Sequence, residues 1–270
     1  MAGTLPTLFI SHGSPMHALD VGAVSEAWAA LGARYPHPRA ILIASAHWDT
    51  KLPMLTGNAK PETIHDFSGF PAPLYEIRYA APGAPDIAAR AQQLLKDAGY
   101  TAAIDGLRGL DHGAWSPLLH SHPKADVPVV QVSLQTALGA RHHLQLGRAL
   151  APLGREGVLI IGSGQATHNL RERTDSDEAL PYVVEFQAWV RDRLESGAID
   201  ELTDYRSRAP HAARAHPTEE HFLPLFVALG AAGERTRAER VYGAVENGVL
   251  AMDAYQFNRA VSPQPGVNPA

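Results

Sequence analysis

Residues 40–46, AILIASA, form a nearly continuous apolar run that ends at the polar cluster 47–49, HWD. A run of this length, rich in β-branched and aliphatic residues and bounded by polar ones, is typical of a strand that is buried on both faces. Residues 5–11 (LPTLFIS) and 158–161 (VLII) repeat the pattern. The three runs therefore predict central, parallel strands of an α/β sheet.

Helical patterns alternate with such runs along the rest of the chain. The predicted helices lie at 24–31, 86–99, 141–153, 182–194 and 222–232, and further strands at 51–56, 101–104 and 127–134. Two last strand-like stretches, 241–245 and 249–255, predict a closing hairpin around Asn247-Gly248. With no internal repeat and no linker, residues 1–270 are predicted to form one α/β domain. Its tail, 262–270, is rich in Pro, Gly and Asn and is expected to be poorly ordered.

Composition limits the possible partners and location. The chain has 270 residues, of which 45% are hydrophobic and 19% charged, and this excludes a disordered or collagen-like protein. Its 23 basic and 28 acidic residues give a net charge of −5, which argues against nucleic acid or an anionic membrane as a partner. No apolar run approaches the roughly 20 residues of a spanning helix, and the opening segment lacks the charged region of a secretory signal. We therefore expect a cytoplasmic protein.

The chain contains 14 histidines and no cysteine. Without cysteine there is no disulfide, no thiolate nucleophile and no sulfur-ligated metal, so a metal site must use nitrogen and oxygen ligands. Imidazole is a suitable ligand for zinc, copper, iron and nickel. The abundance of histidine therefore directs attention to where these residues lie.

Three histidines follow predicted strands: His12, His47 and His168. Because the carboxyl ends of parallel strands meet at one edge of an open sheet, these side chains are expected to converge there. His221 lies where the C-terminal helix is predicted to begin, and His112 lies in a predicted polar loop. Convergence of several neutral imidazoles would form a transition-metal site. A single histidine at a strand end is more often a hydrogen-bonded structural residue, and only the set of three favours a site.

These strand ends allow two other interpretations, an anion-binding loop and the nucleophile of a serine hydrolase. Residues 162–164, Gly-Ser-Gly, could bind an anion through backbone N–H groups, but the third glycine of a dinucleotide fingerprint is replaced by Thr167. Neither 162–164 nor 12–16 fits the nucleophile elbow of a serine hydrolase. Seven histidines have no positional argument and are predicted to lie on the surface or on a helix face: His17, His37, His120, His122, His142, His143 and His211.

Seven short segments occur in order over nearly the whole chain. They are 11–16 (SHGSPM), 44–48 (ASAHW), 63–71 (TIHDFSGFP), 74–83 (LY with YAAPG), 110–115 (LDHGAW), 163–170 (SG with THNL) and 216–225 (HPTEEHFLPL). With these segments the sequence resembles the class III, LigB-type extradiol ring-cleavage dioxygenases, in the branch of the 4,5-DOPA dioxygenases. Each segment is short, but seven in order make the resemblance specific at the family level.

The resemblance implies a single α/β domain around a mixed, mostly parallel sheet flanked by helices, with a metal at the carboxyl edge of the strands. It suggests that His12, His47 and His221 hold the metal. The family at large uses two histidines and a glutamate, which is typical of non-haem Fe(II) oxygenases. In this chain the third position matches His221, and Glu219 and Glu220 are then candidates for outer-shell partners.

The resemblance also implies roles for four further residues. His168 resembles the acid/base of the active site and is sometimes treated as a fourth neighbour of the metal. His112 resembles a second active-site histidine that steadies the bound oxygen. His65 and Asp66 are expected to line the substrate pocket, and a turn that simply buries two phenylalanines is an equally weighted alternative.

The implied reaction is the insertion of both atoms of O2 into a DOPA-like or other substituted catechol at a histidine-bound Fe(II), which gives a ring-opened semialdehyde. Zn(II) is expected to be able to occupy the site in the isolated protein. Two alternatives stay open: a zinc-dependent hydrolase that uses three histidines and water, and a non-enzymatic interaction protein on the same fold, similar to the Memo proteins. The catechol, the bond cleaved and the formation of a homo-oligomer are left open.

Overall fold

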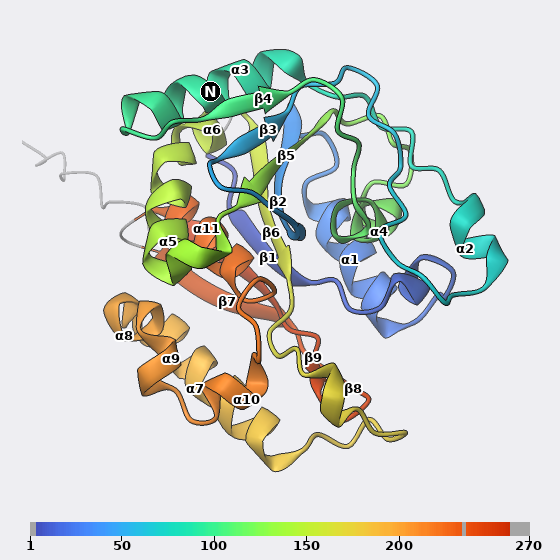
Figure 1. Cartoon of the computed structure of the whole chain (residues 1–270), viewed down its shortest axis with the longest axis vertical. Helices are drawn as coiled ribbons and strands as arrows, with labels where there is room; N and C mark the ends of the chain where they lie inside the picture. The colour runs from blue at the N-terminus through green and yellow to red at the C-terminus, as the bar shows by residue number, and fades with distance from the viewer. Residues whose placement is uncertain (1–3, 234–235, 260–270) are drawn as a thin grey trace, which may run out of the picture.

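A mixed sheet of eight strands runs through the middle of the computed structural model, which describes residues 4–233 and 236–259 (Figure 1). The strand order is β4-β3-β5-β2-β6-β1-β10-β7. The bounds are β1 (Thr7–Ser11), β2 (Ala40–Asp49), β3 (Met54–Thr56), β4 (Ala103–Asp105), β5 (Val129–Leu134), β6 (Val158–Gly164), β7 (Thr236–Tyr242) and β10 (Ala254–Arg259). The central strands β5, β2, β6 and β1 are parallel, whereas β3 and β10 run antiparallel to the strands beside them in this central group. The predicted fold class is confirmed.

The register of the central strands aligns their carboxyl ends. Ser163 of β6 pairs with Ile10 of β1 on one side and with Ser45 of β2 on the other. All residues of β1 and β6 are buried, as their apolar sequences predict. The residues that follow these strands therefore emerge close together at one edge of the sheet.

Helices cover both faces of the sheet (Figure 1). On one face lie α1 (Ala23–Arg34) and α4 (His112–Ser121), and on the other lie α3 (Pro85–Asp97), α5 (Gly139–Leu150) and α11 (Leu223–Ala232). All ten residues of α11 are buried, because this helix packs against both the sheet and α5. The remaining elements are η1 (Pro15–Ala18), α2 (Ala72–Glu76), η2 (Thr136–Leu138), α6 (Pro152–Arg155), η3 (Leu170–Glu172), α7 (Pro181–Ser196), α8 (Ile199–Thr203), α9 (Tyr205–Arg208) and α10 (Ala212–Ala215).

Two helical predictions need correction. His112, predicted to lie in a polar loop, is the first residue of α4, a helix whose sequence HGAWSPLLHS contains Gly and an internal Pro and so obscures its helical pattern. The helix expected over 141–153 is interrupted at Ala151, where Pro152 begins the separate short helix α6. The C-terminal helix begins at Leu223, so His221 lies just before it.

The closing hairpin is confirmed around Asn247-Gly248. These residues have positive φ angles of 50° and 71° and connect β8 (Val245–Glu246) with β9 (Leu250–Ala251). The sequence did not predict that the hairpin continues into β7 and β10, which extend the main sheet with β10 antiparallel to β1. The tail predicted over 262–270 lies outside the described residues.

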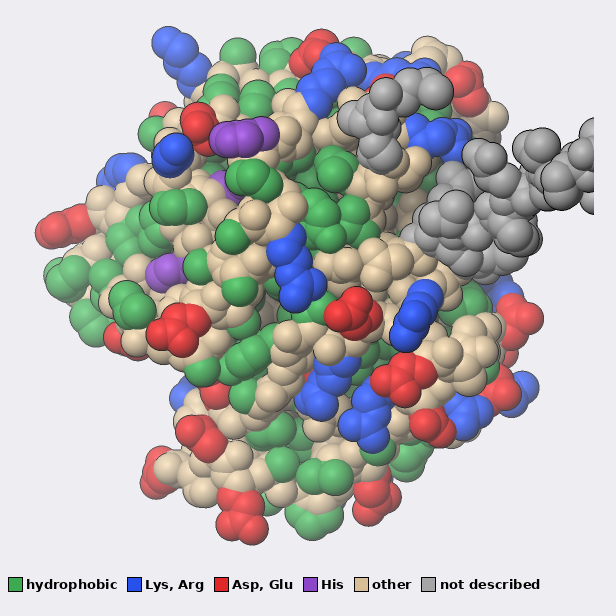
Figure 2. Space-filling view, turned by 180° about the vertical axis from the view of Figure 1, so that it is seen from behind, with side chains coloured by type: hydrophobic (Ala, Val, Ile, Leu, Met, Phe, Trp, Pro, Cys, Tyr) green, Lys and Arg blue, Asp and Glu red, His purple; other side chains and the backbone are tan. Residues whose placement is uncertain are grey.

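Over the described part of the chain, no helix combines the length and apolarity that crossing a membrane requires. The face shown in Figure 2 carries acidic and basic side chains next to one another. This mixture accords with the modest net charge of −5.

Candidate metal centre

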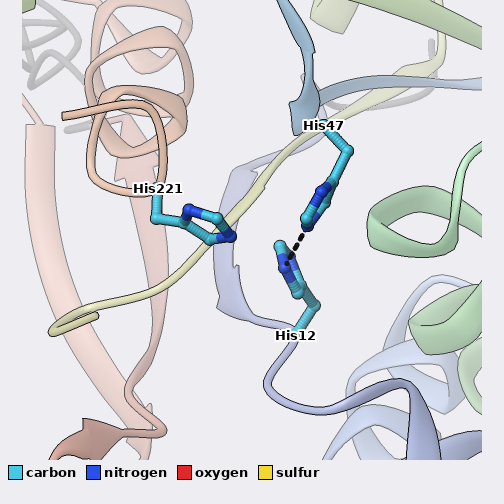
Figure 3. Close-up of side chains that lie close together, drawn as sticks. All are labelled: His12, His47 and His221. Carbon is cyan, nitrogen blue, oxygen red and sulfur yellow. Dashed lines mark hydrogen bonds between the residues drawn. The ribbon is translucent and has the colours of Figure 1, made fainter. Parts of the chain in front are cut away.

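Three histidines from distant parts of the chain meet at the carboxyl edge of the sheet (Figure 3). His12 follows β1 directly, His47 lies near the end of β2, and His221 lies two residues before α11. One ring nitrogen from each falls within 4.8 Å of the others. The Nε2 atoms of His12 and His47 are 3.0 Å apart.

The tautomer of His12 follows from its hydrogen bonds. The Ser163 hydroxyl donates its only hydrogen to the carbonyl oxygen of Gly113. Ser163 Oγ can therefore only accept from His12 Nδ1, which lies 3.0 Å away. The proton of neutral His12 is on Nδ1, and Nε2 presents a lone pair toward His47.

A carboxylate fixes the ring of His221 in the same way, because His221 Nδ1 lies 3.0 Å from Glu220 Oε1. An ionised carboxylate can only accept, so Nδ1 of His221 carries the hydrogen and its Nε2 is left with a lone pair. His47 Nδ1 lies 3.4 Å from Asp66 Oδ2, a charge contact without a hydrogen bond that favours the hydrogen on Nδ1. A carboxylate behind the imidazole is the usual arrangement around histidines that bind metals.

The three rings are held in the uncharged form. Burial lowers the pKa of His12 and of His221 well below 6.5, and it lowers the pKa of His47 to about 4. Burial also raises the pKa of Glu220, but the hydrogen bond with His221 outweighs it and brings the pKa to about 2. Neutral imidazole beside ionised carboxylate is the protonation state that metal binding requires.

Donor geometry and chemistry fit a divalent transition metal. The Nε2 atoms of His12 and His47, 3.0 Å apart, make a hydrogen bond if one of them carries a hydrogen, and with lone pairs on both they could share a cation (Figure 3). Two nitrogens at about 2.0–2.1 Å from one ion are about 3 Å apart when they subtend roughly 90°. His12, His47 and His221 could therefore hold such an ion with positions left for other ligands.

Two glycines allow this close approach. A Cβ atom on Gly164 would overlap the carbonyl oxygen of His221, and a Cβ atom on Gly113 would overlap Ser45 Oγ. The Gln165 N–H donates to the same His221 carbonyl at 2.7 Å. Gly164 thus brings the His221 segment against β6, which accounts for a glycine in the 162–164 segment without a phosphate site.

Asp66 links two of the histidines. Its Oδ1 accepts from the backbone N–H of His112 at 2.9 Å and from His112 Nδ1 at 3.0 Å, while Oδ2 faces His47. Burial raises the pKa of Asp66, but the hydrogen bonds from His112 outweigh this and lower the pKa to about 2. Asp66 lines the cavity; its Oδ1 is occupied by His112.

His168 stacks on His221. The ring centroids are 3.6 Å apart and the planes differ by 10°. Burial lowers the pKa of His168, and the charge of Glu220 partly opposes this. His168 is therefore a neutral base beside the three converging histidines. One of its ring nitrogens lies within 4.8 Å of a ring nitrogen of His221 and of a carboxylate oxygen of Glu220.

A cavity of about 270 Å³ opens in front of the histidines. It is lined by His12, Gly13, Ser14, Pro15, His47, Asp66, Phe67, Phe70, His112, His168, Leu170, Arg173, His221, Asn247 and Leu250. Six of the seven site residues named from the sequence are in this set. Two aromatic rings, Phe67 and Phe70, pack edge to face at 5.4 Å and give the cavity an apolar wall.

His65 is placed differently from the prediction. It does not line the cavity, because its Nε2 turns to the carbonyl oxygen of Ile77 at 3.2 Å. Its ring packs edge-on against Phe67 and lies 5.7 Å from Trp115. His65 thus supports the aromatic wall from behind, which corresponds to the alternative of a turn that buries phenylalanines.

Two histidines assigned to the surface or to a helix face are buried. His143 lies on α5 with no exposed surface, and it donates from Nδ1 to the Gly139 carbonyl while Nε2 accepts from the Gln135 N–H. His122 is 5% exposed and contacts the Tyr35 carbonyl. Both are satisfied structural residues, and their patterns in the sequence do not differ from those of exposed histidines.

The comparisons with known proteins agree with this geometry. The family described as the catalytic LigB subunit of aromatic ring-opening dioxygenase matches residues 6–250. The chain belongs to the LigB family. It is 45% identical to a 4,5-DOPA dioxygenase extradiol of Beta vulgaris over 93% of this chain and 96% of that protein. It is also 38% identical to a 4,5-DOPA dioxygenase extradiol of Escherichia coli, over 94% of each.

A solved structure is similar as well. The crystal structure of an uncharacterized protein, JW3007, from Escherichia coli K12 superposes with a TM-score of 0.80 at 32% identity, over 93% of this chain and 99% of that one. Membership of the LigB family confirms the predicted resemblance and the enzyme class, an aromatic ring-opening dioxygenase. It favours that class over the hydrolase and the Memo-like interaction protein.

Sequence reasoning missed Ser163 and Arg173. Ser163 lies in a Gly-Ser-Gly segment that resembles phosphate-binding and hydrolase motifs, and these motifs do not predict its role. The signal that could have identified Ser163 is its alternation with two glycines. Arg173 lies in a loop with no apolar periodicity, and nothing in the sequence separates it from Arg171. Only the packing of this loop against the β8–β9 hairpin brings Arg173 to the cavity.

Proposed function

We propose that this LigB-family protein is an extradiol dioxygenase that inserts both atoms of O2 into a catechol at an Fe(II) ion held by His12, His47 and His221. The product is a ring-opened semialdehyde. The observation that carries the proposal is the convergence of three neutral imidazoles, with Nδ1 of His12 and of His221 hydrogen-bonded behind the ring and Nδ1 of His47 facing the Asp66 carboxylate. The relatives from Beta vulgaris and Escherichia coli, both named 4,5-DOPA dioxygenase extradiol, support a DOPA-like or otherwise substituted catechol as substrate.

Fe(II) bound at this site would supply the one-electron and oxygen chemistry that side chains lack. The protein provides orientation and proton transfer. Three rings on one side leave the opposite side open to the cavity, so the catechol and O2 are brought together in one place. The wall formed by Phe67 and Phe70 offers an apolar surface for stacking of the catechol ring.

His168 is assigned to proton transfer. A phenolic hydroxyl has an ordinary pKa near 10, so a catechol needs a base to lose its proton at neutral pH. His168 lines the cavity, and burial lowers its pKa so that the ring is neutral and able to accept. The proton taken up at His168 is then available for return to the oxygen that departs when the ring opens.

His112 is assigned to the reacting oxygen. Its Nδ1–H is held by Asp66 at 3.0 Å, so Nε2 is the ring nitrogen available for hydrogen bonding in the cavity. The backbone N–H of His112 donates to the same carboxylate oxygen, which fixes the start of α4 relative to the ring. A ring with a single orientation and tautomer can hold an oxygen atom in a defined position.

Zn(II) fits the same three imidazoles and binds such sites more tightly than Fe(II). We therefore expect zinc in protein purified in air, and this form should be inactive because Zn(II) has no redox chemistry. The cytoplasmic location, the extent of the domain over 1–270 and a homo-oligomer stay predictions.

The test compares metal forms of one preparation. The metal-free protein is reconstituted anaerobically with Fe(II) or Zn(II), mixed with DOPA and with 4-methylcatechol, and followed by an oxygen electrode and by the yellow colour of a ring-cleaved product. Only the Fe(II) form should consume oxygen, and with ¹⁸O2 both atoms should enter the product. The absence of oxygen uptake by fully loaded Fe(II) protein across a panel of catechols would overturn the proposal, and ester hydrolysis by the Zn(II) form would support the hydrolase.

A further inference from the structure

Arg173 lines the same cavity as the converging histidines, yet the part of the chain that the structure describes contains no ion pair of its guanidinium. Its neighbour Glu172 is engaged elsewhere, since both carboxylate oxygens accept from Arg214, the closer pair at 2.6 Å. Within the described residues, the guanidinium of Arg173 therefore has no carboxylate partner. A charged side chain that lines a ligand cavity without such a partner can bind an anionic group of the ligand.

The loop that carries Arg173 is fixed to the β8–β9 hairpin. Arg173 Nη2 donates to Asn247 Oδ1 at 3.1 Å, and the Thr174 N–H donates to the Asn247 carbonyl at 2.9 Å. Asn247 is itself held by Asp177, whose carboxylate accepts its N–H at 2.9 Å. In Figure 1 this loop, drawn in yellow, lies beside β8 and β9. Within the described residues, this contact uses one of the five N–H donors of the guanidinium and leaves four to bind a planar anion.

The charges around the cavity favour a ligand with an anionic group. Asp66 is the only carboxylate among the lining residues; its Oδ1 accepts two hydrogen bonds from His112, and its Oδ2 lies 3.4 Å from His47 Nδ1. Arg173 is the one arginine or lysine among the lining residues, and a guanidinium is always charged.

We propose that Arg173 binds a carboxylate on the side arm of the catechol and so determines how strongly the site prefers an acidic side arm to a neutral one. The inference rests on the proposed function, because the hydroxyls must lie at the histidines for the arm to extend toward Arg173. Phe67 and Phe70 would contact the ring between these two ends. Because Arg173 is a cation, a side arm that carries a carboxylate is expected to bind more tightly than one that is neutral or carries an ammonium group.

Binding to the Zn(II) form tests the inference without turnover. Isothermal titration compares 3-(3,4-dihydroxyphenyl)propionate, which carries the acid, with 4-propylcatechol, which is neutral, and with dopamine, which is cationic. The acid should bind roughly tenfold or more tightly than the neutral catechol, as expected for a charge-assisted hydrogen bond, and this preference should shrink as salt is added.

Arg173→Gln should weaken binding of the acid roughly five- to thirtyfold and leave 4-propylcatechol unchanged. Arg173→Glu should reverse the preference in favour of dopamine. Arg171→Gln is the matched control, because Arg171 is an exposed arginine two residues away that does not line the cavity, and its replacement should change neither ligand.

Equal weakening of the acid and the neutral catechol by Arg173→Gln would overturn the inference, as would wild-type protein with no preference for the acid. The proposed function fails in a different way. If the Fe(II) form consumes oxygen with neutral catechols but shows no preference for acids, the assignment of Arg173 alone is wrong. If no catechol binds or is cleaved, both are wrong.

Discussion

Ser163→Ala is the substitution that most directly tests how the metal centre is organised. Ser163 has no exposed surface, donates to the Gly113 carbonyl and accepts from His12 Nδ1 at 3.0 Å. Alanine removes the hydroxyl and leaves the volume of the site almost unchanged. The buried Nδ1–H of His12 then has no acceptor.

The expected magnitude follows from the cost of an unpaired buried donor, which is about 1–3 kcal/mol. His12 can avoid that cost by moving its hydrogen to Nε2, and that tautomer has no lone pair for a metal. At about 1.4 kcal/mol per factor of ten, metal affinity should fall roughly ten- to hundredfold, which agrees with the usual effect of removing a partner behind a metal-bound histidine. The Gly113 carbonyl also loses a donor, so the free energy of unfolding should fall by about 1–3 kcal/mol.

Affinity is measured on metal-free protein by competition with a chromophoric chelator for Zn(II), and stability is measured by urea unfolding of the same sample. Ser133→Ala is the matched control, because Ser133 is equally buried and hydrogen-bonded to Thr50 and to the Met54 N–H but lies away from the histidines. It should lose stability and keep metal affinity. If Ser163→Ala loses stability while its zinc affinity stays within a factor of two of wild type, the serine does not set the tautomer of His12.

Three further outcomes are expected. His221→Ala should lose its metal in elemental analysis, whereas His168→Ala should keep it and lose roughly 10²–10⁴-fold in kcat under matched iron loading. Glu220→Gln should weaken zinc binding about 10–100-fold in chelator competition, while Glu219→Gln should leave it unchanged because Glu219 accepts from a tyrosine hydroxyl instead. Burial lowers the pKa of His143 from 6.5 to about 4, so its contribution to the free energy of unfolding is complete above pH 6.5. About 3 kcal/mol of that free energy is lost as the pH falls toward 4. In urea unfolding, the free energy of unfolding of His143→Gln should therefore decline less than that of wild type over this pH range.

The sequence was sufficient to predict the centre of the fold, because buried parallel strands have a simple signature. The runs at 5–11, 40–46 and 158–161 became β1, β2 and β6, which lie next to one another in the sheet. Once these strands are parallel, their carboxyl ends share an edge, and histidines that follow them must be close. The positions of His12 and His47 thus follow from strand patterns alone, and that of His221 needed the family resemblance.

The parts that were missed depend on contacts between distant segments. The helix that begins at His112 has weak local propensity and is stabilised by packing against α1 and β2. The edge strand β7 is partly exposed and rich in charged residues. The place of β10 beside β1, with β7 outside it, is set by pairing of β10 with β1 over a long sequence separation. Local patterns do not encode such pairings, so the edge of the sheet and the cavity wall beyond it could not be predicted.

The Gly162-Ser163-Gly164 segment shows what sequence analysis could have added. Residues in a strand point alternately to opposite faces, so the two glycines face α11 while Ser163 between them faces α4. On the first face the absence of side chains admits the backbone of His221, and on the second a hydroxyl orients His12. At the end of a buried strand, two small residues with one polar residue between them therefore indicate two things. Another segment packs against the strand on the face of the small residues, and the polar residue orients a side chain on the opposite face. By this pattern, Ser163 is recognisable from the sequence as a supporting residue of the site.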